Sequence, residues 1–100
     1  MRLEFHPAAA AELKQAAVWY RDRSPVAARS LLVELESALA RILASPSRFP
    51  PYVAGSRRCF LPTFPFGVIY LSNDECVLVL AIAHHRRRPG FWTERVPKIP

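Results

Sequence analysis

Residue types that stabilise small secreted domains or mark common catalytic motifs are scarce in this sequence. Its 100 residues include two cysteines and three glycines. Two cysteines are too few for a disulfide framework, and Cys59 and Cys76 lack the spacing of a paired metal site. There is no glycine-rich phosphate loop, no nucleophile elbow and no pair of carboxylates suited to a catalytic cleft. The adjacent His84 and His85 lack further ligands at metal-site spacing, so we expect no zinc and no cofactor.

Long apolar runs are also missing. No run approaches the roughly 20 residues that span a bilayer, and residues 1–13 turn polar too early for a secretory signal peptide. We therefore expect a cytoplasmic protein with no membrane contact, whose thiols are reduced. A chain of this length has room for one hydrophobic core, and 51% hydrophobic residues are enough to build it. We predict a single domain over residues 1–100.

Acidic residues are outnumbered. The chain has 14 Lys and Arg against 8 Asp and Glu, a net charge of +6, and its pI is about 10.2. Twelve of the basic residues are Arg, which suits forked contacts with carboxylates and phosphates. Three of them form a run over residues 86–88. The surplus predicts an acidic partner, whether nucleic acid, an anionic surface or an acidic protein, although a solvated basic face is the plain alternative.

The first half of the chain predicts two helices. His6 and Pro7 begin the first, because proline is well tolerated in a first helical turn. Ser24 and Pro25 end it and begin the second, with Ser24 as the cap. The second helix ends near Pro46. The first apolar face contains Ala9, Leu13, Ala16, Ala17 and Tyr20, with Glu12, Lys14 and Arg21 off it. The second contains Ala28, Leu31, Leu32, Leu35, Leu39, Ile42 and Leu43. With almost no linker, the helices should form an antiparallel hairpin.

Apolar alternation and β-branched runs predict four strands, over residues 2–5, 57–61, 66–71 and 77–83. Proline-rich residues 46–56 form a loop, and turns follow at residues 62–65 and 72–74. The last strand is unbroken and apolar, which is typical of a central strand covered by helices. The tail from His84 to Pro100 is basic and runs along the surface. The fold class is α+β, in the order β-α-α-β-β-β, with a helical hairpin packed on a mainly antiparallel four-stranded sheet.

Several local sequences occur in an order that resembles the RelE/ParE toxin superfamily, over nearly the whole chain. They are residues 6–8 (HPA), 17–20 (AVWY), 45–50 (SPSRFP), 57–61 (RRCFL), 64–70 (FPFGVIY) and 83–92 (AHHRRRPGFW), with Arg95 after them. The set is most similar to the ParE-type, plasmid-stabilisation branch. The resemblance implies the toxin of a type II toxin–antitoxin pair. It also implies one of two activities, because the RelE branch cleaves messenger RNA on the ribosome whereas the ParE branch poisons DNA gyrase.

The resemblance to the ribonuclease branch is incomplete at the catalytic positions. Metal-free RNA cleavage requires a base, a cation for the phosphorane and an acid for the leaving oxygen. Arg58 and Arg86 match two basic residues of that branch. Phe60, Gly67 and Trp92 stand where the branch has a lysine, an arginine and a tyrosine. Arginine is a poor general base, and tryptophan has no titratable proton. These losses argue against a nuclease.

Two histidines keep the ribonuclease alternative open, because histidine is the residue type in this region that ordinarily serves as a general base near neutral pH. If the chain is a metal-independent endoribonuclease acting with the ribosome on messenger RNA, the catalytic candidates are Arg58, His85 and Arg86. The simpler interpretation, which we favour, is that one histidine faces the core and the other is solvated.

Inhibition of DNA gyrase requires a protein-binding surface and no catalytic residue. Arginines and aromatic residues are typical anchors of such surfaces. The candidate contacts for the target or partner are Arg57, Arg58, Arg86, Arg87, Arg88, Phe91, Trp92 and Arg95. Phe91 and Trp92 have a structural alternative, which is to hold the tail against the sheet. We favour gyrase inhibition over RNA cleavage and expect a protein that is not an enzyme.

The second expected partner is a cognate acidic antitoxin. Its flexible acidic segment would pair with Arg57, Arg58 and residues 86–88, while its apolar residues cover the sheet or the helical hairpin. A degenerate member that only binds its antitoxin is a further alternative. Both helices have the pattern of core helices, so we expect no direct sequence-specific DNA binding.

Overall fold

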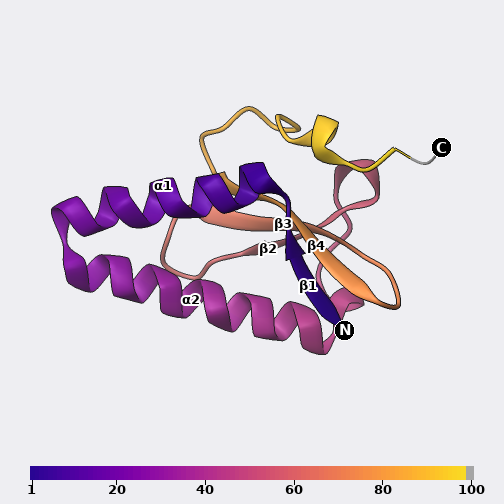
Figure 1. Cartoon of the computed structure of the whole chain (residues 1–100), viewed down its shortest axis with the longest axis horizontal. Coiled ribbons are helices and arrows are strands. Elements are labelled where there is room, and N and C mark those ends of the chain that lie inside the picture. Colours follow the sequence, from indigo (N-terminus) through magenta and orange to yellow (C-terminus); the bar gives the residue numbers. More distant parts are fainter. Residues whose placement is uncertain (99–100) are drawn as a thin grey trace.

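A helical hairpin and a four-stranded sheet form the computed structural model, which describes residues 1–98 (Figure 1). The elements are β1 (Arg2–Phe5), α1 (Pro7–Arg23), α2 (Pro25–Ala44), β2 (Arg57–Phe60), β3 (Phe66–Ser72) and β4 (Cys76–His84), with short 3-10 turns at Pro46–Arg48, Val53–Gly55 and Thr93–Arg95. The predicted α+β order is confirmed. Residues 99 and 100 of the predicted tail lie outside the described part.

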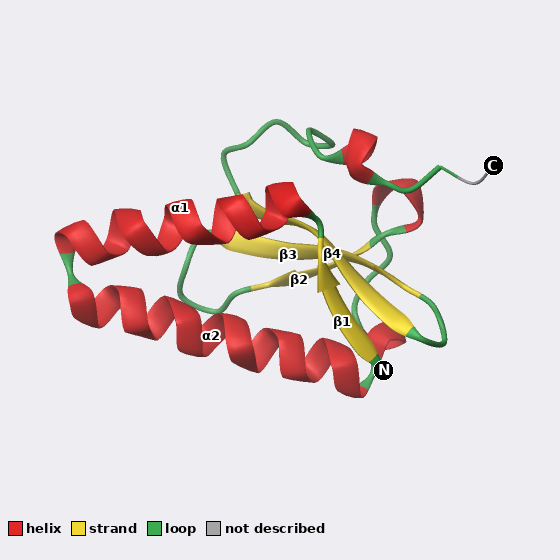
Figure 2. Cartoon of the chain, in the orientation of Figure 1, coloured by secondary structure: helices red, strands yellow, loops and turns green. Residues whose placement is uncertain are grey.

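Local capping sets the helix ends. The His6 side chain accepts a hydrogen bond from the Ala8 amide at 3.1 Å, and Pro7 occupies the first helical position. The Ser24 amide donates to the Tyr20 carbonyl at 2.6 Å, which closes α1. The Ser24 hydroxyl accepts from the Ala27 amide at 3.2 Å, which caps α2. One residue therefore ends one helix and begins the next, and the resulting hairpin extends beyond the sheet (Figure 2).

The sheet is mixed, in the order β1-β4-β3-β2. β4 is central, as predicted; it pairs in parallel with β1 and antiparallel with β3, which pairs antiparallel with β2. Tyr70 faces Val79 whereas Ile69 faces Ala81, so Leu80 is an extra residue in β4. Such a bulge leaves one residue outside the ladder. As a result, Leu80 and Ala81 both belong to the apolar cluster on the sheet face away from the helices.

The larger core lies between the hairpin and one face of the sheet. α2 contributes its apolar stripe, whereas α1 contributes the small side chains of Ala9 and Ala16, both buried. Two sequence predictions about these helices are wrong. Leu32 is 39% exposed. Glu12, expected off the packed face, has only 12% of its side chain exposed. Glu12 is held there by hydrogen bonds with β4 and the carboxy-terminal segment.

The second face of the sheet has its own smaller cluster. After β4 the chain turns back across this face, in yellow in Figure 1. Trp92 is only 1% exposed and packs in a cluster with Ile69, Leu80 and Ala81. A side chain of this size dominates the burial of a small cluster. The segment 86–98 is therefore anchored to the sheet by Trp92, as the structural alternative for that residue predicted.

Candidate functional site

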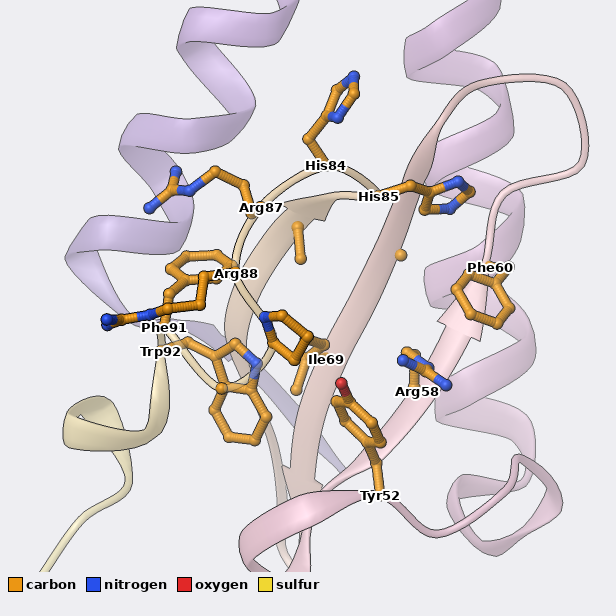
Figure 3. Close-up of a pocket in the computed structure, with 14 residues that line it drawn as sticks. Tyr52, Arg58, Phe60, Ile69, His84, His85, Arg87, Arg88, Phe91 and Trp92 are labelled. Carbon is orange, nitrogen blue, oxygen red and sulfur yellow. The ribbon is translucent and has the colours of Figure 1, made fainter.

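A hollow of about 350 Å³ lies on the sheet face away from the helices; we call it the sheet-face concavity (Figure 3). The loop before β2, the strands β2, β3 and β4, and the carboxy-terminal segment form its wall. The lining residues are Tyr52, Arg58, Phe60, Gly67, Ile69, Ala83, His84, His85, Arg87, Arg88, Pro89, Gly90, Phe91 and Trp92. They include three arginines and no carboxylate. The concavity is thus positively charged.

Arg58 lies between two aromatic rings. Its guanidinium carbon is 3.9 Å from the centre of the Tyr52 ring and 4.6 Å from that of Phe60, and Figure 3 shows the three side chains together. Tyr52 comes from the proline-rich loop, whereas Phe60 is two residues along the same strand and shares its face. Stacking of this kind holds a planar guanidinium in place and leaves its N–H edges open. Among residues 1–98 no acidic side chain pairs with Arg58.

Arg87 and Phe91 form a second stacked pair across the concavity. The Arg87 guanidinium carbon lies 3.9 Å from the centre of the Phe91 ring. Its Nη1 atom is 3.9 Å from a carboxylate oxygen of Glu12, and 53% of the Arg87 side chain is exposed. At this distance and exposure the ion pair is weak. Arg87 therefore keeps most of its capacity to bind an anion.

Arg95 is bound within the chain. Its Nη1 and Nη2 atoms donate to the two carboxylate oxygens of Glu12, at 2.9 and 3.0 Å. Nη1 also donates to the Leu80 carbonyl at 2.9 Å, and the Glu12 carboxylate accepts from the Ile82 amide at 3.1 Å. These β4 groups lie beyond Phe5, the last residue of β1 that pairs with β4. The ion pair therefore satisfies backbone groups where β4 continues past β1.

The two histidines have different surroundings. His84 is half-buried and packs edge-on against Phe66, with ring centres 5.2 Å apart; its Nδ1 atom accepts from the Arg86 amide at 3.0 Å. His85 is exposed and packs edge-on against Phe60, also at 5.2 Å. His85 thus shares the Phe60 ring with Arg58, the one geometric link between residues of the nuclease alternative.

The concavity brings together six of the sequence-predicted site residues and leaves out three. Those that line it are Arg58, His85, Arg87, Arg88, Phe91 and Trp92. Arg57 instead donates to the Phe49 carbonyl at 2.7 Å. Arg95 is paired with Glu12, and Arg86 is exposed but does not line the hollow. Sequence reasoning missed Tyr52 and Glu12. Tyr52 reaches Arg58 only because the loop before β2 folds back, and Glu12 acts through Arg95, which is 83 residues away in the sequence.

Two groups with raised pKa values, Cys59 and Tyr70, lie on the other face of the sheet, in the core that faces the hairpin. Burial raises the pKa of the Cys59 thiol, and the nearby Arg41 and Arg48 oppose this effect. Burial also raises the pKa of Tyr70, whose hydroxyl donates to the Pro46 carbonyl at 2.6 Å. Both groups are kept neutral and belong to the core, so they offer no acid or base to the concavity.

The described residues were also compared with the requirements of a metal site and of a membrane span. Within residues 1–98, no three His, Cys, Asp or Glu side chains lie where they could hold a metal ion. In the same part of the chain, neither helix has the length and apolar character needed to cross a membrane. The side chains that line the concavity with polar or aromatic groups are those of arginine, histidine, tyrosine, phenylalanine and tryptophan.

Comparison with known proteins gives consistent matches. Residues 3–89 match the family model described as "ParE toxin of type II toxin-antitoxin system, parDE". "Toxin ParE2" of Mycobacterium tuberculosis, in strains CDC 1551 / Oshkosh and H37Rv, is 28% identical over 90 residues, which cover 89% of this chain and 86% of the relative. A solved structure titled "Chromosomal ParDE TA system from P. aeruginosa" superposes with a TM-score of 0.72 at 20% identity, covering 84% of this chain and 95% of the other.

Proposed function

Since the chain belongs to the ParE toxin family of type II toxin–antitoxin systems, we propose that it inhibits DNA gyrase and that a cognate antitoxin neutralises it. It acts in the cytoplasm as one domain. The observation that carries the proposal is the sheet-face concavity, where arginines and aromatic rings are held in place without a set of groups for acid–base catalysis. Arginine and aromatic side chains are the usual anchors of protein interfaces.

Three positions argue against RNA cleavage. Phe60 and Gly67, which replace basic residues of the ribonuclease branch, are paired across β2 and β3. Trp92, which replaces the tyrosine, is 1% exposed. A phenyl ring, a glycine and a buried indole supply neither a proton nor a charge for the phosphorane. Binding to a protein target requires none of these groups.

The contact surface for gyrase is narrower than the sequence predicted. Arg57 and Arg95 are bound internally, and Trp92 is buried. We assign the contacts to the exposed Arg86 and Arg88 with Arg87 and Phe91 beside them. Guanidinium groups at the rim of an interface speed association and select acidic partners.

The test combines cells and purified protein. Thymidine and methionine incorporation are followed within minutes of inducing the toxin, and purified toxin is added to a gyrase supercoiling assay. We expect DNA synthesis to fall first and supercoiling to be inhibited. Adding the protein encoded beside the toxin gene should restore supercoiling. A fall in protein synthesis before DNA synthesis, with normal supercoiling, would contradict the proposal.

A ribosome-dependent ribonuclease is the second candidate, and one observation favours it. His85 and Arg58 both pack on the Phe60 ring, so a potential base lies near a potential phosphate ligand. In that case His85→Ala would abolish toxicity and messenger RNA cleavage together. If gyrase is the target, His85→Ala leaves supercoiling inhibition within a few-fold of wild type.

A further inference from the structure

We propose that the sheet-face concavity is an acceptor for an acidic segment of the antitoxin, with Arg58 as the main carboxylate ligand and Arg87 as the second. The inference rests on the proposed neutralisation by an antitoxin and adds the site and the chemistry of the contact. Its starting point is the half-buried Arg58, which lies in a concavity without a carboxylate. A guanidinium partly withdrawn from water loses hydration, and a bound carboxylate would compensate that loss with charge-assisted hydrogen bonds.

The geometry of Arg58 suits a carboxylate. Tyr52 and Phe60 flank the guanidinium, at 3.9 and 4.6 Å from its carbon. Because its faces are covered, its planar N–H edges are the part that a ligand meets, and two parallel hydrogen bonds to one carboxylate match that shape. The stacking also restricts the side chain before binding, so less conformational entropy is lost when the ligand arrives.

Arg87 supplies a second anchor of the same kind. Phe91 holds its guanidinium at 3.9 Å, on the carboxy-terminal segment, while Arg58 is on β2. Both line the same hollow, and Arg88 adds a third positive charge at its rim. Because Arg58 and Arg87 place two restrained guanidinium groups on opposite sides of the concavity, the site should select a segment with at least two acidic residues. A neighbouring apolar residue packs on Phe60, which is 52% exposed.

The same rings argue for a peptide over a single-stranded nucleic acid. Non-specific binding of single strands depends on aromatic faces on which bases stack. Here Arg58 lies against Tyr52 and Phe60, Arg87 lies against Phe91, and Trp92 is buried, so Phe60, which is 52% exposed, is the most open of these rings. The concavity therefore offers several guanidinium groups and one half-exposed ring, not a row of open ring faces.

The test measures the affinity of the full-length toxin for the antitoxin encoded beside its gene. Arg58→Gln removes the charge and should weaken binding by ~30-fold or more, the range for loss of one partner of a buried charged pair. Arg58→Lys keeps the charge without the planar edge and should recover only part of the affinity. The matched control, Arg2→Gln, removes the same charge at the opposite sheet edge, where 69% of the side chain is exposed, and should change binding less than threefold.

A second measurement identifies the partner group. Each acidic residue of the antitoxin is changed to its amide, alone and together with Arg58→Gln. For one of these antitoxin substitutions, the loss of binding free energy should be strongly non-additive with that of Arg58→Gln, because both substitutions remove the same contact. Thermal unfolding of each variant shows that the fold is retained.

The outcomes separate the two proposals. If wild-type toxin binds the antitoxin but Arg58→Gln binds equally well, the acceptor site is wrong and neutralisation stands. If antitoxin affinity falls while supercoiling is never inhibited, the acceptor site stands and the gyrase target is wrong. If Arg58→Gln abolishes binding of a labelled single-stranded RNA decamer and leaves antitoxin binding unchanged, the concavity is a nucleic-acid site. If wild-type toxin does not bind the antitoxin, both proposals fail.

Discussion

Glu12 of α1 and Arg95 of the carboxy-terminal segment form a two-pronged ion pair, with N–O distances of 2.9 and 3.0 Å, across 83 residues of sequence. Their side chains are 12% and 16% exposed. The pair also binds the Leu80 carbonyl and the Ile82 amide of β4. It therefore joins three parts of the fold at one point: the first helix, the central strand and the segment that borders the concavity.

We predict that Glu12→Gln lowers the free energy of unfolding by about 3 kcal/mol, because it leaves the guanidinium of Arg95 without its counter-charge in a largely buried place. Urea unfolding followed by circular dichroism measures the change. Glu4→Gln is the matched control, since Glu4 pairs with Arg2 at 3.9 Å on the surface and should contribute less than about 0.5 kcal/mol. Equal effects of the two substitutions would show that the Glu12–Arg95 pair does not hold the segment.

The two tryptophans should contribute very differently to stability. Trp92 is 1% exposed and Trp19 is 50% exposed. Trp92→Ala removes the centre of the second cluster and is expected to cost about 3–5 kcal/mol, whereas Trp19→Ala should cost less than about 1 kcal/mol. Fluorescence of the Trp19→Phe variant, which retains only Trp92, should have a blue-shifted maximum. Emission typical of water-exposed indole from that variant would contradict the buried position.

Stability should fall at alkaline pH because of Tyr70. Burial raises the pKa of its hydroxyl above the ordinary 10.0, partly opposed by the positive charge of Arg57. Above about pH 10 the unfolded chain loses this proton while the folded chain keeps it, so unfolding becomes more favourable as pH rises. The contribution is fully present below the unfolded pKa and is lost as pH rises towards the folded pKa. Unfolding free energies measured from pH 8 to 11 test this.

Tyr70→Phe should show a shallower alkaline decline. At pH 8 the variant is expected to be less stable by about 1 kcal/mol, because the hydrogen bond to the Pro46 carbonyl is lost. Cys59→Ala is the companion variant, since burial also raises the pKa of this thiol from 9.0 and its share of the decline begins one unit lower. An identical alkaline slope in wild type and Tyr70→Phe would refute the assignment to Tyr70.

Two glycines at the concavity should respond differently to alanine. Gly90 has a φ of +78°, and a Cβ atom there would lie 3.6 Å from Thr93 Cγ2, which is an ordinary contact, so Gly90→Ala is expected to cost about 1 kcal/mol through the left-handed backbone. Gly67 has ordinary strand geometry, and a Cβ atom would lie 3.3 Å from the half-exposed Phe60 ring. Gly67→Ala should change stability by less than about 1 kcal/mol, because that ring can move outward. Thermal unfolding distinguishes the two.

The helices and strands could be predicted because their signals are local. Ser24 and Pro25 carry the cap and the first helical position within two residues, and both roles are confirmed. Leu32 was misassigned because it fits the three- and four-residue spacing but is 39% exposed. Glu12 was misassigned because helical periodicity places a charged residue on the exposed face. In the structure, hydrogen bonds from Arg95 and the β4 backbone offset the cost of burying its carboxylate.

The candidate site was predictable only in part. The placement of Arg58 and Phe60 on one face of β2 follows from strand alternation, and the basic run over residues 86–88 is visible in the sequence. That Tyr52 lies on the other side of Arg58 is not visible, because it depends on how the loop over residues 46–56 folds back. Which arginines are bound internally is equally hidden.

By itself, the sequence determined the order of the elements, the helical hairpin, the central position of the last strand and the resemblance to the toxin family, which the family match confirms. Periodicity, capping and turn chemistry act over a few residues and remain legible in a single chain. Only the tertiary structure decided the parallel pairing of β1 with β4, the bulge at Leu80, and which arginines remain available to a partner. These features depend on contacts between residues far apart in sequence, whose free energy is gained only when the sheet, the hairpin and the last segment are packed together.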